Sequence, residues 1–282
     1  MYCWVNGKVI DERDVHISPF DHGFLYGLGF FEVFRTYQGR AILLEEHFNR
    51  LCSSLNHYRI SMPYTIKSIE NAIFELLKRG SNKDSVFRLN VSAGTAMDSF
   101  PLQYKNPNVI LFQEALPLRK RGTEKKAIWL KTRRNTPEQH TRFKSHHFGN
   151  NILARFEIDN LDTTEGFFLT SKGLVAEGVK SNIFWVRDGI LYTPSLVAGI
   201  VPGITRQWVI HAAQQFGIPV VEDIFIKSDV ENAYECFVTN SIEELVPISK
   251  IGRTKFLGES GPVYQRLHHA YIEEIIQTMK RG

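Results

Sequence analysis

The sequence has few cysteines and no long apolar segment. Its 282 residues include only three cysteines, Cys3, Cys52 and Cys236, which are odd in number, far apart and without the spacing of metal ligands. This pattern argues against a disulfide framework and a metal site, and it is typical of a reducing compartment. No run of about 18 apolar residues occurs, and the N-terminus lacks an apolar run behind a basic head. We therefore expect a cytoplasmic protein without a membrane span or a signal peptide.

The chain also lacks a strong excess of either charge. Its 34 basic and 30 acidic residues leave a net charge of +4, which is too small for a protein that binds nucleic acid mainly by electrostatics. Five basic residues fall within 119–126, a charged stretch that we expect to be a solvated connector. A non-enzymatic protein that binds nucleic acid or another anion through this stretch is the alternative from a different functional class.

Composition and length predict two domains. Apolar residues make up 43% of the chain, which is enough for a sizeable core and excludes a disordered protein. At roughly 150 residues per domain, the length favours two domains. We expect a small N-terminal α/β domain at 1–115, an interdomain linker at 116–126 and a larger, β-rich C-terminal domain at 127–282. Together they make an α+β two-domain fold.

Hydrophobic periodicity and turn residues place the elements of these domains. In the first domain they predict strands at Tyr2–Val5, Lys8–Ile10, Phe30–Tyr37, Ala41–Leu44, Val86–Ser92 and Val109–Glu114, and helices at Glu45–Tyr58 and Ile66–Lys78. In the second domain they predict strands at Ala127–Thr132 and Glu235–Thr239, and helices near His147–Asn160, at Ile204–Phe216 and at Pro262–Lys280.

The segment RFKSHHFGNN places Lys144 between Phe143 and two histidines, near the start of a helical pattern. A lysine in a partly desolvated pocket has a lowered pKa, acts as an amine nucleophile and can form a Schiff base. The alternative is an ordinary surface lysine, because this residue type is almost never buried without a partner.

The segment LVAEGVKSNIFWV interrupts an apolar strand with the carboxylate of Glu177. A buried carboxylate is costly unless it meets a cation, and the protonated ring nitrogen of a heterocyclic cofactor is such a partner. A glutamate at a strand end that faces water is the alternative.

Two further segments suit a phosphate group. Gly203, Ile204 and Thr205 open a helical run, and the N–H groups at a helix N-terminus bind anions. Arg50, on the helix predicted at 45–58, carries a forked donor that fits phosphate oxygens. A Schiff-base lysine, a carboxylate for a pyridinium nitrogen and two phosphate contacts together match the requirements of pyridoxal 5'-phosphate.

Six segments carry a resemblance that covers nearly the whole chain. They are SPFDHGFLYGLGFFEVFRTYQG, EEHFNRL, RFKSHHFGNNILARFEI, AEGVKSNIFWV, PGITRQ and FVTNSIEELVPI. In their order and spacing the chain resembles the fold-type IV pyridoxal-phosphate enzymes, which include branched-chain aminotransferases, D-amino-acid aminotransferases and 4-amino-4-deoxychorismate lyases. The resemblance implies a fold like that of D-amino-acid aminotransferases, with a small α/β domain and a larger β-rich pseudo-barrel domain.

The same resemblance implies roles for individual residues. Lys144 carries the cofactor as a Schiff base and acts as the general acid/base, and Glu177 contacts the pyridine nitrogen. The phosphate is held by Arg50, by the backbone at Ile204 and Thr205, and by the turn at Asn240 and Ser241.

Within this family the chain looks most like the aminodeoxychorismate lyases of Gram-positive bacteria, through SPFDHGFLYG, FRLNVSAG, RRNTPE and KSHHFGNNILARFEI. That resemblance implies a lyase that converts 4-amino-4-deoxychorismate to 4-aminobenzoate and pyruvate in folate biosynthesis. D-amino-acid aminotransferases carry an arginine and a histidine shortly after the strand at 88–92, whereas this chain reads SAGTAMDSF there. An aminotransferase for branched-chain or D-amino acids is the alternative on the same fold.

Three residues are candidates for binding the substrate carboxylates: Tyr26, Arg88 and Arg134. Packing in the core or at the surface is the alternative for each of them. Family members are usually homodimers, so the resemblance implies a homodimer that acts on a small-molecule substrate. It also implies functional coupling to an aminodeoxychorismate synthase, and no nucleic-acid or membrane partner.

Overall fold

The computed structural model describes residues 2–80, 84–96, 98–116 and 120–280. The chain divides into two compact units. Unit 1 consists of Met1–Pro117, Phe143–His147 and Thr278–Gly282, and unit 2 consists of Leu118–Arg142 and Phe148–Gln277. The short segment that carries Lys144 thus belongs to unit 1, although it follows the linker that the sequence predicts. Residues 117–119 of that linker lie outside the described residues.

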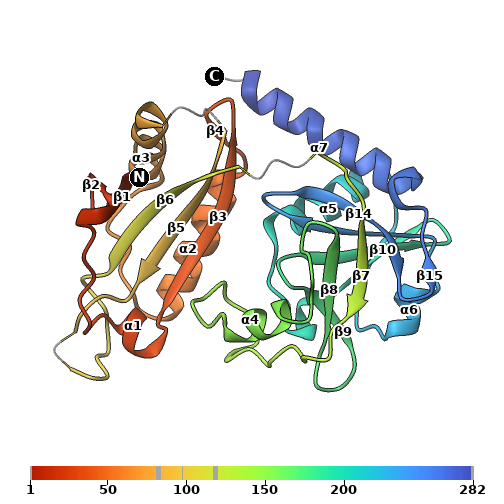
Figure 1. The fold of residues 1–282 in the computed structure, drawn as a ribbon, viewed down its shortest axis with the longest axis horizontal. Helices are drawn as coiled ribbons and strands as arrows, with labels where there is room; N and C mark the ends of the chain where they lie inside the picture. Colours follow the sequence, from red (N-terminus) through yellow and green to blue (C-terminus); the bar gives the residue numbers. More distant parts are fainter. Residues whose placement is uncertain (1, 81–83, 97, 117–119, 281–282) are drawn as a thin grey trace. The chain divides into compact units, whose positions relative to one another are not determined.

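Unit 1 is built on an antiparallel sheet whose strand order, within the described ranges, is β2-β1-β6-β5-β3-β4 (Figure 1). The strands are β1 (Tyr2–Val5), β2 (Lys8–Asp11), β3 (Gly29–Tyr37), β4 (Arg40–Ala41), β5 (Ser85–Ser92) and β6 (Asn108–Ala115). The strand predicted at Ala41–Leu44 is wrong beyond Ala41. Leu43 instead has a φ of 53° and is the N-cap of the next helix, so the chain leaves the sheet there.

Two amphipathic helices, α2 (Leu44–His57) and α3 (Ile66–Arg79), pack against one face of this sheet. Phe30 and Phe34 of β3 lie in the apolar core that the helices cover. Successive strand side chains alternate between the two faces, so Phe31 points to the opposite face. The unit also contains the short helix α1 (His22–Tyr26) and a 3-10 turn, η1 (Glu12–Asp14).

Unit 2 is β-rich. Among its described residues the sheet order is β12-β11-β10-β13-β14-β7-β8-β9, with β15 paired to β14. The strands are β7 (Lys125–Trp129), β8 (Thr164–Leu169), β9 (Val175–Gly178), β10 (Asn182–Arg187), β11 (Ile190–Pro194), β12 (Val220–Asp223), β13 (Glu235–Asn240), β14 (Glu244–Ile251) and β15 (Thr254–Lys255). The helices are α4 (Gly149–Arg155), α5 (Ile204–Gln215), α6 (Lys227–Glu231) and α7 (Pro262–Lys280), with 3-10 turns η2 (Leu196–Ala198) and η3 (Gly258–Ser260).

Apolar side chains cover both faces of the unit 2 sheet. Phe167 and Phe168 are consecutive in β8 and lie in two different apolar clusters, as the alternation of strand side chains requires. The helix expected near His147–Asn160 is shorter, since α4 ends at Arg155. In the described part of the chain, no helix is both long and apolar enough to cross a membrane.

The end of the predicted linker belongs to a strand. β7 begins at Lys125, which is 4% exposed, and its ammonium lies 2.8 Å from a carboxylate oxygen of Glu243. This residue is therefore buried and ion-paired instead of solvated, and the basic stretch is not a continuous charged connector.

Candidate active site

Lys144 lies in a short segment that extends the edge of the unit 1 sheet. Phe31 donates its backbone N–H to the carbonyl of Lys144 at 3.0 Å, and His146 donates to the carbonyl of Gly29 at 2.9 Å. Ser145 pairs with Phe30 in antiparallel fashion, so Lys144 and His146 point to the face away from the helices. The ammonium of Lys144 is 4.7 Å from the centre of the Phe31 ring. The lysine is thus half-buried beside an aromatic side chain on a rigid strand edge.

Arg88 and Asn90 of β5 share this face with Lys144. Phe31 pairs with Asn90 across the sheet, and the guanidinium of Arg88 lies 3.8 Å from the centre of the Phe31 ring. The amide oxygen of Asn90 is 3.3 Å from Nη2 of Arg88 and 2.9 Å from Nε2 of His146. Because arginine only donates, the Asn90 oxygen accepts from Arg88. The same oxygen must also accept from His146, so Nε2 of His146 carries the proton. Burial and the charge of Arg88 lower the pKa of His146 to about 4, against the attraction of Asp21, so its imidazole is neutral near pH 7.

Arg50 of α2 forms a two-pronged ion pair with Glu32 of β3. Its Nε and Nη2 donate to the two carboxylate oxygens at 2.7 and 2.6 Å, and Nδ1 of His47 lies 2.7 Å from one of them. Burial alone would raise the pKa of Glu32, but the charges of Arg50 and His47 and their hydrogen bonds lower it to about 2. Burial lowers the pKa of His47, and the charges of Arg50 and Lys144 lower it further, against the attraction of Glu32.

Glu32 was missed in the sequence analysis, although its pattern was visible. A single acid stands between aromatic and aliphatic residues in GFFEVF, and such a buried carboxylate needs a cation. The structure shows that Arg50 supplies it. One edge of the Arg50 guanidinium is therefore occupied by Glu32, and the arginine is held in place on α2.

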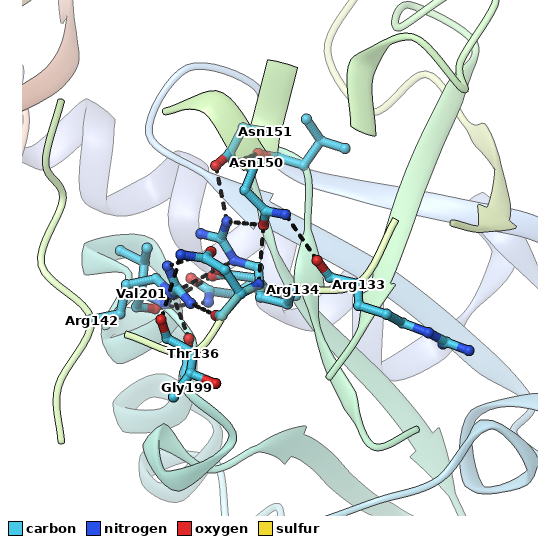
Figure 2. A network of polar contacts seen from close by, with 12 residues as sticks. Arg133, Arg134, Thr136, Arg142, Asn150, Asn151, Gly199 and Val201 are labelled. Carbon is cyan, nitrogen blue, oxygen red and sulfur yellow. Dashed lines mark hydrogen bonds and ion pairs between the residues drawn. The ribbon is translucent and has the colours of Figure 1, made fainter. Parts of the chain in front are cut away.

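In unit 2, Glu177 belongs to a buried polar network with Arg134 and Val201, two residues that Figure 2 labels. One carboxylate oxygen accepts a hydrogen bond from Nε of Arg134 at 2.7 Å, and the other accepts from the backbone N–H of Val201 at 2.8 Å. Nη1 of Arg134 donates to the side-chain oxygens of Asn150 and Asn151, each at 2.9 Å. Nε and Nη1 of Arg134 thus bind three side chains of the chain itself, and its role as a candidate for the substrate carboxylates stays a prediction.

The N-terminus of α5 has the features of an anion site. Gly203 is the N-cap and provides no side-chain cap, and the first N–H groups of a helix lack partners within it. Thr205 is buried, and its hydroxyl has no hydrogen-bond partner among the described residues. A Cβ on Gly203 would lie 2.0 Å from the side-chain oxygen of Asn182, so only glycine fits there. Asn182 in turn donates to the carbonyl of Val201 at 3.0 Å.

The turn after β13 lies next to the same asparagine. Asn182 of β10 pairs with Thr239 of β13, whose buried hydroxyl also lacks a hydrogen-bond partner in the described ranges. Asn240 shapes this turn, since its side-chain oxygen accepts from the N–H groups of Ile242 and Glu243 at 2.9 and 2.7 Å. Its amide nitrogen donates to Glu243 at 3.2 Å, so the Asn240 side chain supports the turn that presents Ser241.

Tyr26 lies at the exposed end of α1. It is 49% exposed, and its ring contacts His22 edge-on at 5.0 Å and stacks with Phe100 at 6.0 Å. Neither contact involves Lys144 or Arg88. The structure thus groups Arg88, but not Tyr26, with Lys144 through the shared contact with Phe31.

Comparisons with known proteins identify relatives along the whole chain. A family model described as amino-transferase class IV matches residues 29–251. The chain is 40% identical to an aminodeoxychorismate lyase of Bacillus subtilis (strain 168), over 96% of this chain and 94% of the relative. It is 33% identical to a putative branched-chain-amino-acid aminotransferase of Methanocaldococcus jannaschii, over 96% and 95% of the two chains.

Solved structures are similar in fold and in cofactor. The branched-chain amino acid aminotransferase from Thermobaculum terrenum, in its PLP-bound holo-form, has a TM-score of 0.85 and 25% identity, and the match covers 98% of this chain and 94% of that chain. These findings confirm the predicted fold-type IV architecture and pyridoxal 5'-phosphate as the cofactor. Because the family model matches most of the chain, the protein belongs to the class IV aminotransferase family.

Proposed function

We propose that the protein is a pyridoxal-phosphate-dependent lyase that converts 4-amino-4-deoxychorismate to 4-aminobenzoate and pyruvate, a step of folate biosynthesis. The observation that carries the choice of reaction is the 40% identity to an aminodeoxychorismate lyase over 96% of the chain. The next relative described, an aminotransferase, is 33% identical over the same share.

The residues of unit 2 fit the cofactor. Each oxygen of the Glu177 carboxylate accepts one hydrogen bond from the described residues, and a carboxylate oxygen accepts two, so a ring N–H can be accepted as well. Among the described residues, the Thr205 hydroxyl has no hydrogen-bond partner and the N-terminus of α5 has no side-chain cap, so both can donate to a phosphate. We assign the ring nitrogen to Glu177 and the phosphate to Ile204, Thr205, Ser241 and the turn shaped by Asn240.

In unit 1, Arg50 and Lys144 are the residues that we propose to bind the cofactor. Arg50 is held by Glu32 through Nε and Nη2, which fixes its guanidinium for a phosphate contact. Lys144 forms the covalent link to the cofactor, and the adjacent strand β3 fixes its backbone. Pyridoxal phosphate supplies an electron sink for the charge that develops at the carbon bearing the substrate amine.

Lys144 is the proposed proton carrier of the reaction. With the substrate amine on the cofactor in its place, Nζ of Lys144 would take the proton from the amine-bearing carbon. Loss of this proton and cleavage of the ring carbon–oxygen bond make the ring aromatic and release the enolpyruvyl group. The same Nζ would then give this proton to the enolpyruvyl methylene, which yields pyruvate. Nζ is then again an amine nucleophile and would displace the amine of 4-aminobenzoate from the cofactor.

Arg88 is the proposed anchor for a substrate carboxylate. It is half-buried, lies against Phe31 beside Lys144, and meets Asn90 only through long contacts of 3.3 and 3.4 Å. A guanidinium with such long contacts can donate stronger, charge-assisted hydrogen bonds to a carboxylate. Tyr26 is a second candidate for contacting the substrate, because its side chain is 49% exposed.

A coupled assay tests the proposal. Chorismate, glutamine and an aminodeoxychorismate synthase generate the substrate, and 4-aminobenzoate and pyruvate are quantified with the wild-type protein, with the Lys144→Ala variant and without protein. We expect equal amounts of both products, dependent on pyridoxal phosphate and lost in Lys144→Ala. Near-normal turnover by that variant would overturn the role of Lys144.

The second candidate is an aminotransferase on the same scaffold, which the 33% identity to a putative branched-chain enzyme favours. If the coupled assay yields neither product while branched-chain or D-amino acids with 2-oxoglutarate yield glutamate, this candidate replaces the lyase. A cheaper test adds an amino acid to the holoenzyme and follows conversion of the cofactor to its pyridoxamine form, which a dedicated lyase performs poorly. The homodimer and the coupling to a synthase stay predictions, which analytical ultracentrifugation and co-purification can test.

A further inference from the structure

Two arginines, Arg134 and Arg142, surround the single carboxylate of Glu177. Their side chains are 5% and 8% exposed, and that of Glu177 is 4% exposed. Nε of Arg134 is hydrogen bonded to Glu177 at 2.7 Å, and Nε of Arg142 lies 3.8 Å from the same oxygen. A buried carboxylate with two guanidinium groups is therefore held by charge as well as by a directed hydrogen bond.

Arg134 connects Glu177 to helix α4. Its Nη1 donates to Asn150 and to Asn151 at 2.9 Å (Figure 2). Asn151 donates to the carbonyl of Val179 at 2.7 Å. Val179 follows directly after β9, the strand of Glu177. The hydrogen bonds thus run from Glu177 through Arg134 and Asn151 to Val179, which is two residues after Glu177 in the chain. This closed network restricts rotation of the Glu177 carboxylate.

Arg142 connects the network to the segment before α5. Its Nε donates to the carbonyl of Gly199 at 2.5 Å, and its two terminal nitrogens donate to the side chain and the carbonyl of Asn135. Two residues after Gly199, the N–H of Val201 donates to Glu177. Burial and the charge of Arg134 lower the pKa of Arg142 to about 10, against the attraction of Glu177 and Glu138, so Arg142 is charged near pH 7.

We propose that Arg134 and Arg142 are positioning residues that fix the Glu177 carboxylate for the cofactor's ring nitrogen and join it to the segment leading into α5. This inference rests on the proposed role of Glu177. Arg134 sets the orientation of the carboxylate, and through it the protonation of the ring nitrogen. Arg142 keeps the carboxylate and the N-terminus of α5 at a fixed separation.

The test measures the ring nitrogen directly, apart from turnover. Wild type, Glu177→Gln, Arg134→Met and Arg142→Met are reconstituted with pyridoxal phosphate labelled with ¹⁵N in the ring, and the nitrogen chemical shift of the bound cofactor is recorded. We expect a protonated nitrogen in wild type, a large shift towards the unprotonated value in Glu177→Gln, and most of that shift in Arg134→Met. Arg142→Met keeps the bond between Arg134 and Glu177, so we expect a nearly wild-type nitrogen signal but about tenfold weaker cofactor binding.

Arg133→Met is the matched control. Arg133 precedes Arg134 and is exposed, and Figure 2 shows its side chain extending away from the network. Only its carbonyl takes part, as the acceptor for Asn150 at 2.8 Å, and the substitution keeps that carbonyl. We expect the wild-type nitrogen signal and cofactor affinity in this variant.

The outcomes separate this inference from the proposed function. A wild-type nitrogen signal in Arg134→Met, or the same change in Arg133→Met, overturns the positioning role. A wild-type signal in Glu177→Gln overturns the assignment of Glu177, and this inference with it, while the lyase proposal is decided by the product assay. If Arg134→Met does not fold, Arg134→Lys keeps the charge but cannot bridge Glu177 and both asparagines, and wild-type behaviour of that variant in both measurements overturns the need for the guanidinium.

Discussion

The substitution Glu32→Gln tests whether the ion pair with Arg50 stabilises unit 1. In the wild type both oxygens of the buried carboxylate accept hydrogen bonds from Arg50, and His47 contacts one of them. A fall of the Glu32 pKa from its usual 4.5 to about 2 corresponds to about 3 kcal/mol of stability near neutral pH. Since the folded-state pKa lies below the unfolded value, this contribution is complete above pH 4.5 and is lost as the pH falls towards 2.

The assay is the free energy of unfolding in urea for the wild type and the variant, measured from pH 7 down to pH 2.5. Glu32→Gln is expected to be less stable by about 3 kcal/mol at pH 7, and the difference between the two proteins should shrink steadily below pH 4.5. Glu75→Gln, at an exposed position of α3, is the control and should differ from the wild type by less than about 0.5 kcal/mol. A difference for Glu32→Gln that is close to zero at pH 7, or constant down to pH 2.5, would refute the reasoning.

The candidate site supports four shorter predictions. Thr205→Val should leave the stability of the cofactor-free protein within about 1 kcal/mol of wild type, because its hydroxyl has no partner in the described chain, but should weaken cofactor binding about tenfold in equilibrium dialysis. Gly203→Ala should lower the stability by about 1–3 kcal/mol in thermal denaturation, because its Cβ would meet Asn182 at 2.0 Å. Arg88→Met should raise KM by about tenfold or more in steady-state kinetics while the cofactor affinity stays at the wild-type value. The imidazole of His146 should stay neutral down to about pH 5 in an NMR titration, because burial and Arg88 lower its pKa to about 4.

Most of the secondary structure is predictable from the sequence because local pattern and tertiary environment agree. The helix predicted at Pro262–Lys280 is α7, and the helix predicted at Ile204–Phe216 differs from α5 by one residue. The prediction of a solvated connector is wrong at Lys125 for a physical reason. A basic residue in a charged run reads as solvated, but its partner Glu243 is 118 residues further along the chain, and only the folded unit brings them together.

Residue type and local pattern predict which side chains belong to the candidate site. They do not predict the hydrogen-bond partners of these side chains. The turn at Asn240 and Ser241 is predicted to hold phosphate, and the side chain of Asn240 accepts hydrogen bonds from Ile242 and Glu243 of that turn. Arg134 is a candidate for the substrate carboxylates, and in the structure its Nε donates to Glu177. In both cases a polar group that is suited to a ligand is equally suited to the chain's own polar groups, and composition alone cannot distinguish these uses.

Buried acidic residues in strands are a case in which the sequence predicts the kind of partner. Glu32 and Glu177 each stand beside apolar residues in a strand, and each meets an arginine that is 18 or 43 residues away in the sequence. The pattern thus predicts that a cation is needed, but not which one. For Glu177 the sequence suggested a cofactor nitrogen and the structure shows an arginine, and the two are compatible because each carboxylate oxygen accepts two hydrogen bonds. An arginine that occupies one acceptor position and fixes the carboxylate leaves the other position available to the ring nitrogen, which supports the proposed role of Arg134 as a positioning residue for Glu177.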